Sequence, residues 1–250
     1  MQTHIIIPAR FGSSRLPGKP LLDLGGKPVI AHVIEQAKAH FDNVYVATDD
    51  TRIFDCAESY GAVAVMTSED HASGTDRLAE VAMTLNLPDE DIVLNLQGDE
   101  PLMPPVLLKQ LEALLLAKPD SEMATLMHEI HTVEELLNPN VVKVAVGENK
   151  RALYFSRAPI PYPRDEFAKD KSVMPAAGNY FRHIGLYGYR VGALKAISAL
   201  AESPLECLEK LEQLRPLSNG IEILIDVSEV MPPHGVDTLA DLEALRKHFE

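Results

Sequence analysis

The sequence predicts an α/β protein built on a doubly wound, mostly parallel sheet. Up to about residue 120, short apolar runs alternate with segments of helical period, the pattern of strands and covering helices. A basic, small-residue loop follows the first apolar run, and the carboxyl ends of strands are where open α/β sheets bind ligands. With 250 residues, 46% of them hydrophobic, the chain can fill the core of one such domain.

The composition restricts the classes of partner. The formal charge of 23 − 37 = −14 argues against a broad nucleic-acid surface, and an anionic substrate would need local cations or a metal. No apolar run approaches the roughly 20 residues of a membrane span, and no secretion signal is apparent at the N-terminus. Cys56 and Cys207 lack metal-ligand spacing and are expected to be buried thiols. We therefore expect a cytoplasmic enzyme without nucleic-acid or membrane partners.

The first strand is predicted at residues 5–7, three isoleucines, and it should end at Pro8, which has no N–H for a ladder bond. The loop that follows, to residue 20, combines small residues with Arg10, Arg15 and Lys19. Backbone amides and cations together suit a phosphate, although a solvated basic loop is the alternative.

The residues of this loop exclude two common phosphate-binding motifs. Only Gly12 and Gly18 occur in the loop, so it lacks the three glycines of the dinucleotide fingerprint. Pro20 follows Gly18-Lys19, where the nucleoside-triphosphatase loop needs Ser or Thr after its lysine.

The next elements are a helix at 28–38, a strand at 43–48, a helix near 53–60 ended by Gly61, and a strand at 62–66. Asp49 and Asp50 follow the second strand. We favour a helix N-cap and a first-turn acid over a metal site for this pair.

Residues 70–80, DHASGTDRLAE, form a polar turn that leads into a helix. His71, Ser73 and Gly74 offer small side chains and backbone amides that suit the edge of a flat base. Thr75 alone fits an ordinary helix cap, so structural and nucleotide-binding interpretations both stay open.

Residues 91–97 are predicted as a central strand, followed by Gly98-Asp99-Glu100-Pro101. A carboxylate at this end of a central strand suits Mg²⁺ shared with triphosphate oxygens, which we favour over a turn aspartate before Pro101. A helix is then expected at 104–116, with these residues facing the core: Val106, Leu107, Leu111, Leu114 and Leu115.

After residue 120 the pattern changes to a smaller mixed lobe with little helix. Strands are expected at 122–130, 141–146, 152–156 and 183–189, with a proline-rich covering segment at 158–180. A helix at 203–215, a strand at 221–227 and a helix at 238–249, capped by Asp237 or Thr238, complete the chain. This gives a core at 1–120, a sugar-binding and dimerisation lobe at 121–220, and a return to the core at 221–250, all in one continuous unit.

Seven stretches, in order, resemble the 3-deoxy-manno-octulosonate (Kdo) cytidylyltransferase family: PARFGSSRLPGKP, DHASGTDRLAE, NLQGDEP, ALYFSRAPIP, RHIGLYGYR, SPLECLEKLEQLR and HGVDTLADLE. The resemblance implies a Rossmann-like nucleotidyltransferase (GT-A-like) fold. It also implies transfer of CMP from CTP to the anomeric hydroxyl of Kdo for lipopolysaccharide biosynthesis, with Mg²⁺, in a cytoplasmic homodimer.

The resemblance also implies roles for individual residues. Those expected around the nucleotide are Pro8, Ala9, Arg10, Ser13, Arg15, Lys19, His71, Ser73 and Gly74. Of these, Arg10, Ser13, Arg15 and Lys19 are expected to hold its phosphates, and the last three to lie against the cytidine. Those expected around the sugar acid are Gln97, Arg157, His183, Tyr187, Glu212 and Gln213. Asp99 and Asp237 are the expected metal ligands, and they join Lys19 and Arg15 as the expected catalytic residues. Residues 167–178 follow the family pattern least.

The chemistry of these side chains agrees with the implied reaction. A carboxylated sugar needs a cation, for which Arg157 is suited, and hydroxyl-binding groups such as His183 and Tyr187. The sugar hydroxyl would itself be the nucleophile, so catalysis would rest on positioning and charge neutralisation.

Three other functions are compatible with parts of this pattern. One is a cytidylyltransferase for a related acidic sugar, such as a nonulosonic acid or 8-amino-3,8-dideoxy-manno-octulosonate. A GT-A glycosyltransferase would need Asp-x-Asp after a strand, which is missing here. A nucleotide-binding module without activity is disfavoured by the presence of both Asp99 and Asp237.

Overall fold

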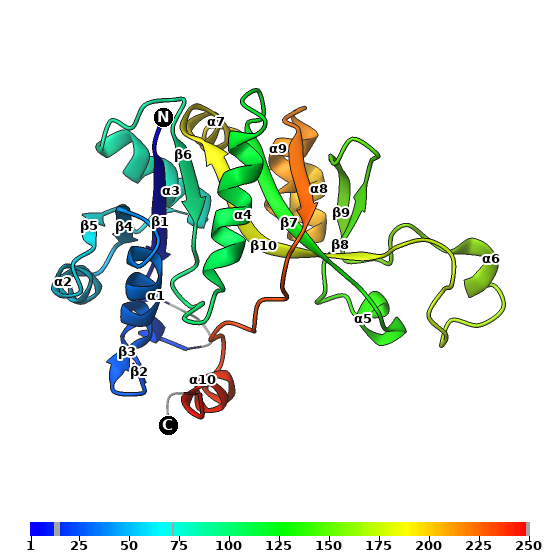
Figure 1. Ribbon diagram of the computed structural model, residues 1–250, viewed down its shortest axis with the longest axis horizontal. Helices are drawn as coiled ribbons and strands as arrows, with labels where there is room; N and C mark the ends of the chain where they lie inside the picture. Colours follow the sequence, from blue (N-terminus) through cyan, green and yellow to red (C-terminus); the bar gives the residue numbers. More distant parts are fainter. Residues whose placement is uncertain (13–15, 72, 249–250) are drawn as a thin grey trace.

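The computed structural model describes residues 1–12, 16–71 and 73–248, and these form one nine-stranded sheet with helices on both faces (Figure 1). The strands of the main path run in the order β11-β7-β10-β6-β1-β4-β5. Their bounds, in that order, are Ile223–Val227, Met123–Glu129, Phe181–Arg190, Ile92–Asn95, Thr3–Ala9, Asn43–Thr48 and Val63–Met66. Neighbours are parallel except at β10, which is antiparallel to both β6 and β7.

Two further strands, β8 (Lys143–Val146) and β9 (Ala152–Ser156), extend the sheet from β10, and β2 (Asp23–Leu24) pairs with β3 (Lys27–Pro28) in a small separate ribbon. The strands beyond residue 120 therefore continue the sheet that the first part of the chain begins.

Helices cover the two faces of the sheet around separate cores. The isoleucines of β1 alternate: Ile5 and Ile7 pack with α1 (Val29–Lys38), α2 (Thr51–Ser59) and α4 (Pro105–Leu116). Ile6 points to the other face, toward α3 (Gly74–Thr84) and α7 (Val191–Ser198). This arrangement confirms the predicted doubly wound α/β fold.

Shorter helices connect and close these layers. They are α5 (Val133–Leu137), α6 (Arg164–Phe167), α8 (Pro204–Glu209), α9 (Leu214–Ser218), α10 (Leu239–Arg246) and the 3₁₀ turn η1 (Lys19–Leu21). Among the described residues, no helix has the length and apolar character needed to span a bilayer.

Several local predictions are confirmed. The strand predicted at 91–97 forms β6, which lies between β1 and β10 in the interior of the sheet. The carboxylate of Asp50 accepts from the backbone N–H groups of Arg52 and Ile53 at 2.9 and 3.4 Å, so it is the N-cap of α2. Gly61, with φ +76°, follows the end of that helix.

Other predictions were wrong. The single helix expected at 203–215 is broken into α8 and α9, because Lys210 adopts a left-handed conformation with φ +54°. Helix α7 was missed, and so were α5 and α6, where little helix was expected. Val106 is exposed and Leu108 is buried in its place.

The thiols and the helix caps also differ in part from expectation. Cys207 is exposed and Cys56 is only partly buried, so neither is the fully buried thiol that the sequence suggested.

Ser73 caps α3, while Thr75 lies inside that helix, and Thr238 is the residue that caps α10.

Strand β10 passes so close to α4 that a glycine is required at the crossing. A Cβ on Gly188 would lie 2.8 Å from Cδ1 of Leu115 and 3.0 Å from Cδ2 of Leu94, both fully buried. We expect Gly188→Ala to lower the free energy of unfolding by about 1–3 kcal/mol, because an extra methyl group overpacks the core. Urea denaturation would measure the change.

Gly185 on the same strand is the matched control, since a Cβ there meets nothing within 4 Å. Gly185→Ala should leave stability within about 0.5 kcal/mol of the parent, as ordinary surface substitutions do. Equal losses in the two variants would contradict the close packing of β10 on α4.

Candidate active site

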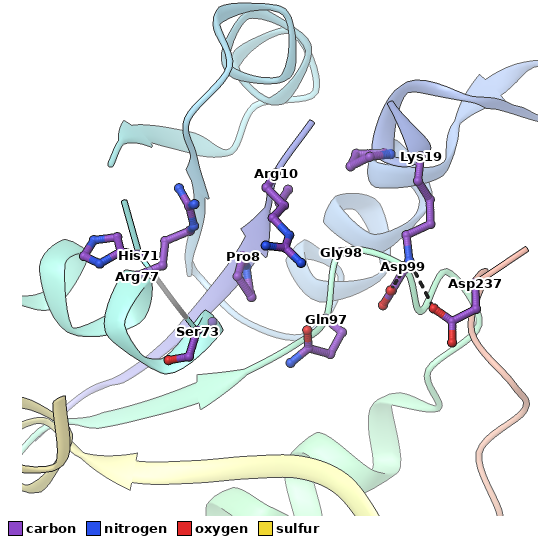
Figure 2. A pocket seen from close by; sticks show the side chains of 13 residues that line it. Pro8, Arg10, Lys19, His71, Ser73, Arg77, Gln97, Gly98, Asp99 and Asp237 are labelled. Carbon is purple, nitrogen blue, oxygen red and sulfur yellow. Dashed lines mark hydrogen bonds and ion pairs between the residues drawn. The ribbon is translucent and has the colours of Figure 1, made fainter. Parts of the chain in front are cut away.

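A cavity of about 290 Å³ opens at the carboxyl ends of β1 and β6 (Figure 2). All the residues predicted at the nucleotide or the metal line this cavity, apart from those outside the described part of the chain. They are Pro8, Ala9, Arg10, Lys19, His71, Ser73, Gly74, Asp99 and Asp237. Gln97 lines it as well. The predicted phosphate ligands Ser13 and Arg15 lie outside the described residues.

Lys19 joins the two predicted metal ligands. Its Nζ donates to Oδ2 of Asp99 at 2.5 Å and to Oδ1 of Asp237 at 3.4 Å (Figure 2). The two carboxylates, far apart in the sequence, therefore converge on one cation. This geometry brings three of the four expected catalytic residues to a single point.

Glycines allow the backbones around Asp99 to approach one another. A Cβ on Gly98 would lie 2.9 Å from the carbonyl oxygen of Pro8, so a side chain there would push the turn away from β1. A Cβ on Gly235 would lie 2.8 Å from the carbonyl oxygen of Asp99, and Val236 N donates to that same oxygen at 2.8 Å. These contacts place Asp237 beside Asp99.

Glu100 adds a third carboxyl group behind this pair. Its burial, reinforced by the negative charges of Asp99 and Asp237, raises its pKa to about 8, although Lys19 opposes the shift. Its Oε2 is buried without a hydrogen-bond partner among the described residues. Asp99 and Asp237 are the two carboxylates that meet at the Lys19 ammonium. Among the described residues, no group of three or more His, Cys, Asp or Glu side chains is arranged to hold a metal ion.

Arg77 is a buried cation of this cavity that the sequence analysis missed. It is 3% exposed, donates from Nη2 to Oδ2 of Asp49 at 2.8 Å, and also hydrogen-bonds the hydroxyl of Thr67. Asp49 therefore pairs with an arginine. Asp50 alone caps α2, and the first turn of that helix has no acidic residue, so the expected first-turn acid was wrong. The role of Arg77 could have been suspected from the sequence, because it is a single arginine among the buried positions of the helix in DHASGTDRLAE.

His71, Ser73 and Gly74 of the same motif also line the cavity, and the first two have hydrogen-bond partners within the motif. His71 Nε2 lies 2.5 Å from Oε2 of Glu80, and Ser73 Oγ accepts from the backbone N–H of Asp76 at 3.2 Å. Gly74 begins α3, where a Cβ would meet only the ring of Pro8, at 3.8 Å. The motif therefore presents a folded, small-residue surface next to the carboxyl end of β1.

A second cavity, of about 220 Å³, shares Gly74 and Gln97 with the first. Tyr187, Glu212 and Gln213, three of the predicted sugar-binding residues, line it. The hydroxyl of Tyr187 and Oε1 of Glu212 are buried without hydrogen-bond partners among the described residues. Polar groups in this state suit a ligand with several hydroxyls.

Desolvation also shifts the titration of groups at this cavity. Burial, followed by the charges of Tyr189 and Glu212, raises the pKa of Tyr187 well above its usual value, so its phenol stays protonated. Burial likewise raises the pKa of the Glu212 carboxyl, opposed by hydrogen bonds from Thr75 and Ser73. Both side chains are therefore suited to hydrogen bonding.

His183 and Arg157 line neither of these two cavities. The ring of His183 lies 5.2 Å from that of Tyr187, tilted by 47°, and desolvation lowers the pKa of His183 to about 3, which keeps its ring neutral. The guanidinium of Arg157 donates to three backbone carbonyls, those of Pro139, Glu209 and Lys210, at 2.9, 2.7 and 3.4 Å. The structure thus does not bring Arg157 to the predicted sugar pocket.

Comparison with known proteins agrees with this architecture. The profile of a cytidylyltransferase family matches residues 4–223. The 3-deoxy-manno-octulosonate cytidylyltransferase of Hahella chejuensis is 53% identical over 243 residues, 97% of this chain and 95% of its own. Its counterpart from Francisella philomiragia is 50% identical over 248 residues, 99% of this chain and 98% of its own.

Solved structures give the same result. A CMP:2-keto-3-deoxy-manno-octonic acid synthetase complexed with CTP superposes with a TM-score of 0.89 at 45% identity, covering 99% of this chain and 98% of its own. A putative glucose-1-phosphate thymidylyltransferase from Bacillus anthracis shares the fold at 16% identity, with a TM-score of 0.62 over 99% of this chain and 95% of its own. This chain belongs to the 3-deoxy-manno-octulosonate cytidylyltransferase family.

Proposed function

We propose that this protein transfers CMP from CTP to the anomeric hydroxyl of 3-deoxy-D-manno-octulosonate, giving CMP-Kdo and diphosphate. The observation that carries the proposal is a pair of cavities that meet at Gly74 and Gln97. One holds cations and converging carboxylates suited to a metal triphosphate, and the other holds hydroxyl-binding side chains. The names of the relatives point to Kdo rather than its 8-amino analogue.

At the nucleotide, Arg10 and Lys19 would neutralise the phosphates, with Ser13 and Arg15 predicted to continue the same loop. Charge-assisted bonds from such groups are about twice as strong as neutral ones. His71, Ser73 and Gly74 would lie against the cytidine, since all three line the same cavity. Figure 2 shows His71 and Ser73 on the side of this cavity away from Asp237.

The reaction needs no protein nucleophile. The anomeric oxygen of the sugar forms a bond to the α-phosphorus, the bond from that phosphorus to the bridging oxygen breaks, and diphosphate leaves while the hydroxyl loses its proton. The residues contribute by aligning the two substrates across Gln97 and by stabilising the charge on the phosphates.

Mg²⁺ is the proposed cofactor, and Asp99 and Asp237 would hold it. Mg²⁺ is usually bound by one or two carboxylates together with substrate phosphates and waters, so this pair suffices. Their convergence on the Lys19 ammonium supports a cation at that point. When bound, the ion would polarise the α-phosphate and favour loss of the hydroxyl proton.

At the sugar, Gln97, Tyr187, Glu212 and Gln213 would contact hydroxyls, while His183 would support the ring of Tyr187 from behind. A direct contact between Arg157 and the sugar carboxylate stays a prediction from the resemblance.

We also propose that the enzyme works in the cytoplasm as a homodimer and supplies an activated sugar for lipopolysaccharide. Exposed leucines support self-association: on α8, Leu208 is 81% and Leu205 41% exposed, and on β9 Leu153 is 61% exposed. Sedimentation velocity at micromolar concentration should give twice the chain mass, and a single monomeric species would contradict the dimer.

The product tests the function directly. Mass spectrometry of a reaction with CTP, Mg²⁺ and Kdo should show CMP-Kdo and an equal amount of diphosphate. Absence of the product, or faster turnover of 8-amino-3,8-dideoxy-manno-octulosonate, would contradict the proposed reaction.

The proposed metal site gives a further prediction. Its two ligands are separated by 138 positions in the sequence (237 − 99), yet we propose that they bind the same ion. Asp99→Asn and Asp237→Asn should each lower turnover about 100-fold or more, as loss of one charge-stabilising group at a reaction centre does. The double variant should be little slower than either single one, because ligands of one ion act as a unit. Steady-state kinetics at saturating Mg²⁺ would measure this.

Thermal melting of the same variants is the control. Thr238 rather than Asp237 caps α10, so Asp237→Asn should leave the melting temperature nearly unchanged. Fully multiplicative rate losses in the double variant would contradict a shared ion.

A further inference from the structure

We propose that Phe11 is a positioning residue, whose ring fixes the point at which Lys19 enters the first cavity. Phe11 does not line that cavity itself. Its role rests on the proposed function, since it assumes that the phosphates of CTP occupy the first cavity. Phe11 would then influence the binding of CTP without touching the nucleotide.

The chain that leaves β1 and the chain that enters η1 meet at Phe11 and Gly18. The backbone N–H of Gly18 donates to the carbonyl of Phe11 at 2.9 Å. Gly18, with φ +67°, is the N-cap of η1, and its carbonyl accepts from the N–H of Leu21 at 2.9 Å. Lys19 is the first residue of that turn, so its position follows from that of Gly18.

The ring of Phe11 packs directly against the backbone of Gly18. A Cβ on Gly18 would lie 2.9 Å from Cε2 and 3.1 Å from Cζ of the ring, so only a glycine can approach the ring this closely. The ring also packs against the core formed by Ile5, Ile7 and the helices on their face of the sheet. It therefore transmits the position of the core to the residue before Lys19.

Arg52, on α2, holds the ring in turn. Its Cζ lies 3.6 Å from the centroid of the Phe11 ring, the geometry of a cation–π interaction. The guanidinium is itself fixed, because Nε and Nη2 donate to the carboxylate of Asp50 at 3.0 and 2.6 Å. Since Asp50 caps α2, the ring is tied to the start of that helix.

The backbone of Phe11 is held at the same junction by Asp49. The N–H of Phe11 lies 3.5 Å from Oδ1 of Asp49, whose Oδ2 accepts from Nη2 of Arg77 at 2.8 Å. Arg77 also lines the first cavity. The two successive aspartates after β4 thus act on one residue, Asp49 on its backbone and Asp50 on its ring through Arg52.

A positioning role and a purely structural role of Phe11 predict different results with two nucleotides. If the ring only supported the fold, its loss would weaken the binding of CTP and CMP alike. If the ring places Lys19, the loss should fall mainly on CTP, because CTP offers three phosphates to the cations of the cavity and CMP offers one.

The first experiment is calorimetric titration of CTP and of CMP, with Mg²⁺ present, into the parent, Phe11→Ala and Phe11→Tyr. Phe11→Ala should lower the affinity for CTP about tenfold, as loss of one charge-assisted bond would, and that for CMP less than about threefold. Phe11→Tyr keeps the ring and should stay within about twofold of the parent for both.

Equal losses of CTP and CMP affinity in Phe11→Ala, or a Phe11→Tyr variant as weak as Phe11→Ala, would overturn the proposal. Phe11→Leu keeps most of the apolar bulk, and it takes the place of Phe11→Ala in the same titrations if the smaller side chain prevents folding. In kinetics, KM for CTP should rise while KM for Kdo is unchanged.

A double-mutant cycle tests whether Arg52 acts through the ring. Arg52→Ala should lower CTP affinity about two- to fivefold, the usual worth of an exposed cation–π interaction. The double variant with Phe11→Ala should stay within about twofold of Phe11→Ala alone, because the partner of Arg52 is then already lost. Multiplicative losses would show that Arg52 acts on the phosphates by itself, and they would overturn its assigned role.

Lys109→Ala is the matched control for Arg52→Ala. Nζ of Lys109 lies 3.8 Å from the centroid of the Phe41 ring, so this variant also removes a cation–π interaction. Neither Lys109 nor Phe41 lines the first cavity. CTP affinity should be unchanged, and a loss as large as that of Arg52→Ala would overturn a specific action on the nucleotide.

The last experiment needs no nucleotide. Amide hydrogen exchange at Gly18, Leu21 and Leu22 should be faster by about tenfold or more in Phe11→Ala than in the parent. In the structure these N–H groups donate to the carbonyls of Phe11, Gly18 and Lys19. Unchanged exchange would overturn the proposal, whereas a parent protein that binds CTP but forms no CMP-Kdo would overturn only the proposed function.

Discussion

The contact between the backbones of Asp99 and the Gly235–Val236 segment is the constraint on which the site depends. Strand β11 lies at one end of the sheet order and β6 in its interior, so the chain after β11 must return across the sheet to reach the cavity (Figure 1). The hydrogen bond from Val236 to the carbonyl of Asp99, and the space left by Gly235, fix where that segment arrives. Asp237 follows at once and meets Asp99 at the ammonium of Lys19.

This geometry also explains how a protein with a net charge of −14 can accept an anionic nucleotide. The cations Arg10, Lys19 and Arg77 are gathered at one cavity, while Asp99, Glu100 and Asp237 form an acidic centre beside them. The carboxylates of Asp99 and Asp237 are balanced by the Lys19 ammonium. The phosphates of a nucleotide would need the basic groups, and the proposed Mg²⁺ would offset the carboxylates when the nucleotide binds.

The sequence was sufficient to predict the elements that depend on neighbouring residues in the chain. The three isoleucines before Pro8, the cap at Asp50 and the apolar runs of β4 and β6 are decided by neighbouring residues, and the loop motifs carried the family resemblance. The break at Lys210, the pairing of Arg77 with Asp49 and the engagement of Arg157 by carbonyls depend on contacts between distant segments. Local propensity favoured one helix over 203–215, but the chain turns at Lys210 and Arg215 pairs back with Glu206 at 2.7 Å.

Calorimetric titration of CTP into Gly235→Ala, with Mg²⁺ and then with EDTA, tests most directly the claim that this backbone contact builds the proposed metal site. Both carboxylates remain in this variant, but the added methyl group pushes the chain away from Asp99. The account predicts that CTP affinity in Mg²⁺ falls about tenfold or more, a loss of about 1.4 kcal/mol, while affinity in EDTA is unchanged. An unaltered gain in affinity from Mg²⁺ would contradict it.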